Sequence, residues 1–195
     1  QMETGSTSYN IPHAISLHRD IQVEKLEAAF RKIIARHENL RVSFDIVAKE
    51  PVQRIARDAA FSVERYQAGI SGVGEIMRQF GRAFDLRKAP LLRAGIIERK
   101  GAGPVLIFDL HHIITDRISQ NILAKEFISL YSGETLAPLR IQYKDFTEWR
   151  SRRERREFLK KQEDYWLNIF ASTIPVLELP TTYPRPAIQS FAGAV

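Results

Sequence analysis

The sequence predicts a layered α/β sandwich. Short runs rich in β-branched and aromatic residues alternate with amphipathic helical patterns of about 10 to 20 residues. The chain has 195 residues, which suits one domain or two small lobes, and a protein of this size buries roughly 70% of its unfolded surface. The sequence contains neither an internal repeat nor a low-complexity tract.

The first part of the chain predicts a strand, a helix and a hairpin. A short strand begins at residues 9–12, and apolar residues at helical spacing over 23–34 predict a helix with Asp20 as its N-cap. β-branched and aromatic residues over 40–47 and 51–56 are typical of two strands joined by a short turn.

The middle of the chain continues the alternation of strands and helices. We expect a strand over 61–66, a helix over 72–82, strands over 90–97 and 105–110, and a helix over 118–131. The helix over 118–131 is expected to end at Ser132-Gly133, because glycine suits the left-handed conformation found at helix C-termini. From residue 174 onward, prolines exclude a helix.

Composition excludes several classes of protein. The chain has 44% hydrophobic and 27% charged residues, as is usual for a globular protein. No apolar run approaches the roughly 18 residues of a membrane span, and residues 1–8 lack the features of a signal peptide. The absence of cysteine excludes disulfides, thiolate metal sites and a cysteine nucleophile, and it fits a cytoplasmic protein.

The chain has a net charge of +6, and many of its basic residues lie in one stretch of the sequence. Residues 143–171 mix basic, acidic and aromatic side chains in a pattern that predicts one long amphipathic helix. A nucleic-acid-binding helix would also be basic, but no helix-turn-helix, zinc-finger or RNP pattern accompanies this one. We therefore favour a solvated basic face over contact with nucleic acid.

A pair of histidines marks the candidate site. His111 and His112 follow the apolar run 105–110, and Asp116 lies just before the next predicted helix. Functional side chains often gather where one element gives way to the next. The alternative is a core histidine with a satisfied hydrogen-bonding partner. The spacing does not match the histidine pair of a zinc helix, and no G-x-S-x-G elbow indicates a serine hydrolase.

Several segments, in order along the chain, carry a resemblance to a known family. They are Tyr9–Pro12, Arg36–Phe44, Phe84–Leu86 with Pro90–Ala94, His111–Asp116, Gln142–Phe146 with Tyr165–Trp166, and Leu177–Thr181 with Arg185-Pro186. Together they resemble the condensation domains of nonribosomal peptide synthetases, which are chloramphenicol acetyltransferase-like acyltransferases. His111–Asp116 is similar to the HHxxxDG motif of that family. Ordered matches over almost the whole chain are far more specific than one motif.

The resemblance implies a domain organisation. A complete condensation domain has two lobes arranged in a V, with the active site in a tunnel between them. The matched segments resemble the amino-terminal lobe, so we expect residues 1–195 to be that lobe of a larger synthetase, ending near the crossover to a carboxy-terminal lobe. We expect the isolated lobe to be inactive.

The resemblance also assigns roles to the site residues. His112 is the catalytic residue, which orients the acceptor amine and accepts its proton. Asp116 is expected to shape the site by pairing with Arg41, or alternatively with Arg36, because a buried carboxylate needs such a partner. His111 is expected to pack or to form a hydrogen bond away from the substrate.

Arg117 departs from the family motif, which usually has glycine at this position. An arginine there needs an ordinary backbone conformation or takes on strain of about 1–3 kcal/mol. It also places a cation beside the reacting centre. Ile118 stands where the family often has an aromatic residue. These departures leave turnover and acceptor choice open.

The implied reaction forms an amide between substrates carried as thioesters on phosphopantetheine arms, as in the biosynthesis of peptide antibiotics. We expect no cofactor or metal on this lobe. The expected partners are peptidyl or acyl carrier protein domains, the carboxy-terminal lobe and an adjacent adenylation domain, without nucleic acid or membrane. Two alternatives stay open: an epimerisation domain of the same fold, and a non-catalytic lobe, disabled by Arg117, that serves as a docking platform for carrier proteins.

Overall fold

The computed structural model describes residues 5–68, 72–151, 153–175, 177, 179–184 and 187. The chain divides into two compact units, Gln1–Tyr143 and Lys144–Val195. All the candidate site residues lie in the first unit.

A four-stranded mixed sheet forms the centre of the first unit. Its strand order is β1 (Asn10–Ser16), β6 (Val105–His111), β5 (Leu92–Glu98) and β4 (Val63–Gln67). Strand β6 runs antiparallel to both of its neighbours, whereas β4 runs parallel to β5. The strands predicted at these positions are confirmed. The pairing of β1 with β6 places the end of β6 next to the start of β1.

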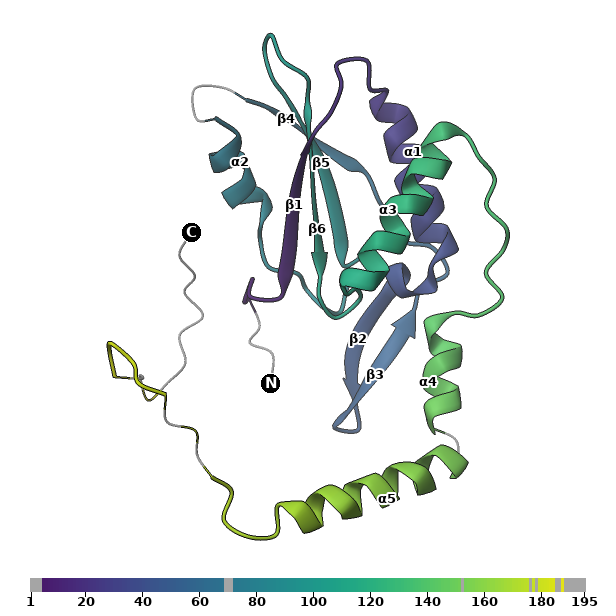
Figure 1. Cartoon of the computed structure of the whole chain (residues 1–195). Coiled ribbons are helices and arrows are strands. Elements are labelled where there is room, and N and C mark those ends of the chain that lie inside the picture. The colour runs from purple at the N-terminus through teal and green to yellow at the C-terminus, as the bar shows by residue number, and fades with distance from the viewer. Residues whose placement is uncertain are drawn as a thin grey trace. The chain divides into compact units, whose positions relative to one another are not determined.

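Helices cover both faces of this sheet, as expected for a layered α/β fold (Figure 1). Helices α1 (Val23–Arg36) and α3 (Arg117–Ser132) pack on one face, and α2 (Gly72–Phe80) packs on the other. The helices predicted over these three regions are confirmed. Each face has its own apolar cluster, so the sheet is buried on both sides.

Alternation along β6 determines which face each of its side chains reaches. Leu106 and Leu110 join the apolar cluster with α1, whereas Ile107 joins the cluster with α2. Because successive side chains of a strand point to opposite faces, Asp109 and His111 lie on the same face as Ile107. The buried histidine of the candidate site therefore belongs to the α2 side of the sheet.

A two-stranded hairpin stands apart from the main sheet. It consists of β2 (Val42–Val47) and β3 (Glu50–Ile55). Ala48 and Lys49 form its turn with φ values of 51° and 69°, the left-handed region that tight hairpin turns use. The short 3₁₀ helix η1 (Glu38–Arg41) precedes β2, so the strand begins two residues later than the predicted start.

Two predicted helix termini can be compared with the structure: the N-cap predicted for α1 is wrong, and the C-terminus predicted for α3 is confirmed. Helix α1 begins after Gln22, which makes no side-chain capping bond, so the prediction of Asp20 as N-cap is wrong. Asp20 lies before the helix, and its carboxylate is 3.1 Å from Nδ1 of His18. The predicted C-terminus of α3 is confirmed, since Gly133 has a φ of 93° and its amide donates to carbonyls of the last turn.

Two helices, α4 (Tyr143–Ser151) and α5 (Arg153–Ile169), cover most of the range predicted as one long helix, and residue 152 lies outside the described residues. The described residues from 174 onward form neither helix nor strand. Arg185-Pro186, which carries part of the family resemblance, lies outside the described residues. Of the helices in the described ranges, none is long and apolar enough to cross a membrane.

The charge of α5 is close to balanced, because its basic and acidic residues are nearly equal in number. The Lys160 ammonium lies 3.3 Å from a Glu163 carboxylate oxygen and 3.0 Å from one of Asp164. These exposed pairs are typical of a solvated helix face.

Candidate functional site

The two histidines lie where β6 ends and a turn leads into α3. His111 is the last residue of β6, and its carbonyl accepts a hydrogen bond from the amide of Ile114 at 3.1 Å. The amide of His112 donates to the carbonyl of Tyr9 at 2.8 Å. On the other side, the side-chain amide of Asn39 donates to the carbonyl of Ile114 at 2.6 Å. The turn is therefore held by bonds from two distant parts of the chain.

His111 is a buried support for this turn. The residue is 5% exposed, and its Nδ1 accepts a hydrogen bond from the amide of Ile113 at 3.1 Å. That bond requires the neutral ring with its proton on Nε2. Burial lowers the pKa of His111, and the neighbouring His112 lowers it further. The ring also packs edge-on against Phe84, with centroids 6.1 Å apart.

His112 differs from its neighbour because it is exposed to solvent. Its backbone is fixed by the bond to Tyr9 and by a turn in which the amide of Thr115 donates to the carbonyl of His112 at 3.4 Å, whereas its ring has no hydrogen-bond partner among the residues that the structure describes. An exposed imidazole on a fixed backbone is accessible to a substrate, whereas the buried ring of His111 is not.

Asp116 is the N-cap of α3. Its carboxylate accepts hydrogen bonds from the amide of Ser119 at 2.7 Å and from the hydroxyl of Ser119 at 2.6 Å. These bonds hold the pKa of Asp116 below its ordinary value. Asp116 is exposed, so it does not need the arginine partner that a buried carboxylate would require.

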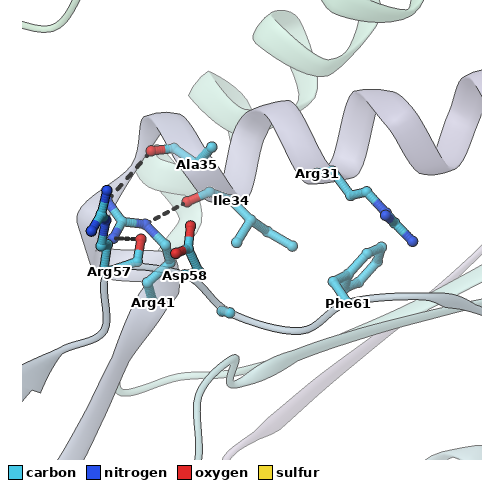
Figure 2. Close-up of a pocket in the computed structure, with 8 residues that line it drawn as sticks. Arg31, Ile34, Ala35, Arg41, Arg57, Asp58 and Phe61 are labelled. Atoms are coloured by element: carbon cyan, nitrogen blue, oxygen red, sulfur yellow. Dashed lines mark hydrogen bonds between the residues drawn. The ribbon is translucent and has the colours of Figure 1, made fainter.

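The predicted pairing of Asp116 with Arg41 is wrong in this structure. Arg41 caps the end of α1, donating to the carbonyls of Ile34 at 3.1 Å and Ala35 at 3.4 Å (Figure 2). It also donates to the carbonyls of Ala56 and Arg57, which follow β3. All these acceptors are backbone oxygens, so Arg41 joins α1 to the segment after the hairpin.

Arg36, the alternative partner, pairs instead with Glu126 of α3, its Nε lying 3.0 Å from the carboxylate. The Nε2 atom of His37 lies 2.6 Å from the same oxygen. Burial raises the pKa of Glu126, but the hydrogen bonds with His37 and Arg36 outweigh burial and leave the pKa below its ordinary value. The pairing of Asp116 with Arg36 is therefore also wrong, and Arg36 joins α1 to α3.

A pocket lies beside α1 rather than at the histidines (Figure 2). Its lining includes Arg31, Arg41 and Phe61 but no residue of the histidine turn. Arg31 pairs with Glu27 within α1, and Arg41 is already bonded to backbone carbonyls. These two cations are therefore engaged in holding the fold.

Arg117 is the first residue of α3 and is exposed. Its φ is not positive, so of the two expectations stated for it, the ordinary backbone conformation is the correct one. A cation at a helix N-terminus opposes the helix dipole, and the carboxylate of Asp116 beside it has the favourable charge.

Arg93 and Asp109 form a buried pair that was not predicted from the sequence. Asp109 is fully buried in β6, and its carboxylate lies 3.6 Å from Nε of Arg93. The sequence feature that could have indicated this pair is Asp109 itself, the one charged residue within the apolar run 105–110 that predicts the strand. Among the described residues, no group of three or more histidine, aspartate or glutamate side chains has the geometry to hold a metal ion.

Comparison with known proteins identifies the family. A model of the condensation domain matches residues 1–194. Bacitracin synthase 2 of Bacillus licheniformis is 45% identical over 193 residues, which is 99% of this chain and 7% of that protein. Gramicidin S synthase 2 of Brevibacillus brevis is 45% identical over 194 residues, which is 100% of this chain and 4% of that protein. The chain belongs to the condensation domain family, as the resemblance predicts.

Solved structures agree on the fold. The X-domain in a complex with OxyB from teicoplanin biosynthesis has a TM-score of 0.80 and 26% identity, and the match covers 92% of this chain and 42% of that chain. The epimerization domain from the third module of tyrocidine synthetase B has a TM-score of 0.73 and 22% identity, with coverage of 93% and 44%. The predicted chloramphenicol acetyltransferase-like fold is confirmed. The chain spans under a tenth of the length of the curated relatives described above and less than half of these solved chains.

Proposed function

We propose that residues 1–195 form the amino-terminal lobe of a condensation domain, in which His112 promotes amide-bond formation between acyl groups carried as thioesters. The observation that carries the proposal is the exposed position of His112 on a turn whose backbone is fixed by Tyr9. The chain keeps both histidines and Asp116 of the family motif, and the family itself supports acyl transfer.

In the proposed reaction, the nitrogen of the acceptor amine attacks the carbonyl carbon of the donor thioester. The carbon–sulfur bond breaks, the amine loses a proton and the departing thiolate gains one, so the products are an amide and a thiol. An α-amine ordinarily has a pKa of about 7.7–8.0, so a useful fraction is neutral near pH 7. His112 therefore orients the amine and accepts its proton late, rather than acting as a strong base from the start.

The proposal gives the other motif residues supporting roles. His111 is buried, its pKa is lowered by burial and its Nδ1 is occupied, so it supports the turn without reaching a substrate. Asp116 starts α3 directly after the turn. Carrier protein domains would present both substrates on phosphopantetheine arms, and a carboxy-terminal lobe would close the site over His112. An adjacent adenylation domain would load a carrier.

The direct test is a His112→Ala variant of the full-length synthetase, assayed with loaded carrier proteins. We expect amide formation to fall by about 10²- to 10⁴-fold, the usual contribution of a general acid–base residue, with unchanged folding. His18→Ala is the matched control, because His18 is an exposed histidine before α1, paired only with Asp20 among the described residues. Parental turnover in the His112 variant would remove this residue from the mechanism.

Arg117 favours a second candidate function, a docking platform without catalysis. It replaces the usual glycine beside His112, and the similar teicoplanin X-domain has been solved in a complex with another protein. The same assay separates the candidates, because a platform would bind loaded carriers without releasing a peptide. Inversion of the aminoacyl stereocentre without amide formation would instead indicate epimerisation.

A further inference from the structure

A buried polar cluster lies on the α2 face of the sheet, close to the end of β6. It consists of Asn10 from β1, Arg93 from β5 and Asp109 from β6. Arg93 is 8% exposed and Asp109 is 0% exposed. The side-chain amide of Asn10 donates to Oδ2 of Asp109 at 2.7 Å, and Nε of Arg93 lies 3.6 Å from the same oxygen.

A contribution to stability does not explain why these three polar side chains are buried together. Burial raises the pKa of Asp109 and lowers the pKa of Arg93, so the surroundings disfavour both charges. Within the described residues, Nε of Arg93 and Oδ1 of Asp109 lack a hydrogen-bond partner. Apolar side chains of similar volume generally stabilise a core as well as, or better than, a buried ion pair. A role in positioning neighbouring parts of the structure explains the cluster better than a contribution to stability does.

The cluster reaches the histidine turn through the segment that follows α2. The carbonyl of Arg82 accepts hydrogen bonds from both Asn10, at 3.0 Å, and Arg93. The guanidinium carbon of Arg93 lies 3.7 Å from the centre of the Phe84 ring. Phe84 in turn packs edge-on against His111. Arg93 thus holds in place the aromatic ring that supports His111.

A second connection runs along β1. Asn10 is paired with His111 in the β1–β6 register, and the preceding residue, Tyr9, accepts the hydrogen bond from the amide of His112. The bond from Asn10 to Asp109 therefore fixes the two strands to each other just before the turn. Both connections end at the backbone that carries His112.

We propose that Asn10, Arg93 and Asp109 are positioning residues that fix the turn carrying His112. The inference rests on the proposed function of His112. A displacement of about 1 Å at a reacting group can lower a rate by about 10²-fold, so a small movement of this turn would reduce kcat even in a well-folded protein.

The test compares variants of the full-length synthetase with loaded carrier proteins. The double variant Arg93→Met, Asp109→Leu replaces both charges with apolar side chains, so neither charge is left buried alone. We expect a melting temperature close to that of the parent, a kcat lower by about 10-fold or more, and an unchanged KM for the acceptor carrier. Arg65→Met is the control, since Arg65 lies on β4 and forms an exposed pair with Glu24; its kcat should equal the parent's.

A folded double variant with parental kcat would overturn the proposal. If the double variant does not fold, Asn10→Ala decides, because it removes two hydrogen bonds but no charge: a reduced kcat supports positioning and an unchanged kcat refutes it. If the parent itself forms no amide, the proposed function fails separately. Crystal structures of parent and variant then test positioning alone, since a displaced 111–114 turn supports it and an unmoved turn contradicts it.

Discussion

The main-chain amide of His112 donates to the carbonyl oxygen of Tyr9 at 2.8 Å. This bond continues the β1–β6 pairing one step beyond Asn10 and His111, the last pair of the register. The backbone of His112 is therefore held by the residue that precedes the first strand of the sheet, in addition to the bonds within its own turn. The point from which the exposed His112 side chain projects is thus fixed by the fold.

Asn39 should matter for both stability and rate, although it lies far from the histidines in sequence. Its side-chain amide donates to the carbonyl of Ile114 in the same turn. We expect Asn39→Ala to lower the free energy of unfolding by about 0.5–1.5 kcal/mol and to reduce amide formation. Urea denaturation and the carrier-loaded assay measure the two effects. Asn121→Ala, at an exposed position of α3, should change neither. Parental values for Asn39→Ala would contradict this role.

The capping role of Asp116 predicts a pH dependence. Its pKa is lowered by the hydrogen bonds from Ser119, so its contribution to stability is present above the unfolded carboxyl pKa of about 3.9 and is lost as the pH falls through the folded value. Asp116→Ala should therefore be less stable than the parent at pH 7, and the difference should shrink below about pH 4. Asp116→Asn should retain most of the stability, because asparagine is also a good N-cap. Chemical denaturation at several pH values is the measurement, and a pH-independent difference would contradict it.

Glu126 should stabilise the junction of α1 and α3. Its carboxylate lies within hydrogen-bonding distance of both Arg36 and His37. We expect Glu126→Gln to lower the free energy of unfolding by about 1.5–3 kcal/mol, the range for hydrogen bonds to charged groups. Because the pKa of Glu126 is lowered, this contribution is present above the unfolded value of about 4.3 and is lost as the pH falls through the folded one. Glu134→Gln, at an exposed position after α3, is the control; equal losses in both variants would refute the prediction.

Arg117→Gly tests whether the departure from the motif affects chemistry or folding. Arg117 has an ordinary helical backbone, so glycine relieves no strain, and we expect no gain in the melting temperature. If the cation beside His112 limits turnover, Arg117→Gly and Arg117→Ala should raise the rate of amide formation to a similar extent. A gain in stability with glycine alone would show that the arginine is strained after all.

The sequence predicted the elements well because hydrophobic periodicity sets them locally. The strand before the histidines and the helix after them follow from apolar spacing, and Gly133 marks the end of α3. The N-cap role of Asp116 could also have been predicted from the sequence, since aspartate is a preferred residue just before a helix. The resemblance favoured an ion pair for Asp116 instead, and that expectation failed because the residue is exposed.

The partners of Arg36, Arg41 and Asp109 depend on tertiary structure. Arg41 bonds to carbonyls on both sides of the hairpin, and Asp109 meets Arg93 only because β5 and β6 are adjacent in the sheet. Neither arrangement has a local spacing that sequence reasoning could use. Asp109, a carboxylate within the otherwise apolar run 105–110, was the sequence feature that indicated a buried polar contact.

The most direct test of the central claim is a single-turnover measurement of amide formation by the full-length synthetase, with both carriers loaded and the His112→Ala variant compared with the parent. Single turnover isolates bond formation from product release and carrier exchange. We predict that the variant binds both carriers as the parent does but forms the amide at least about 100 times more slowly. A single-turnover rate equal to the parent's would contradict the assignment of His112 to the chemistry.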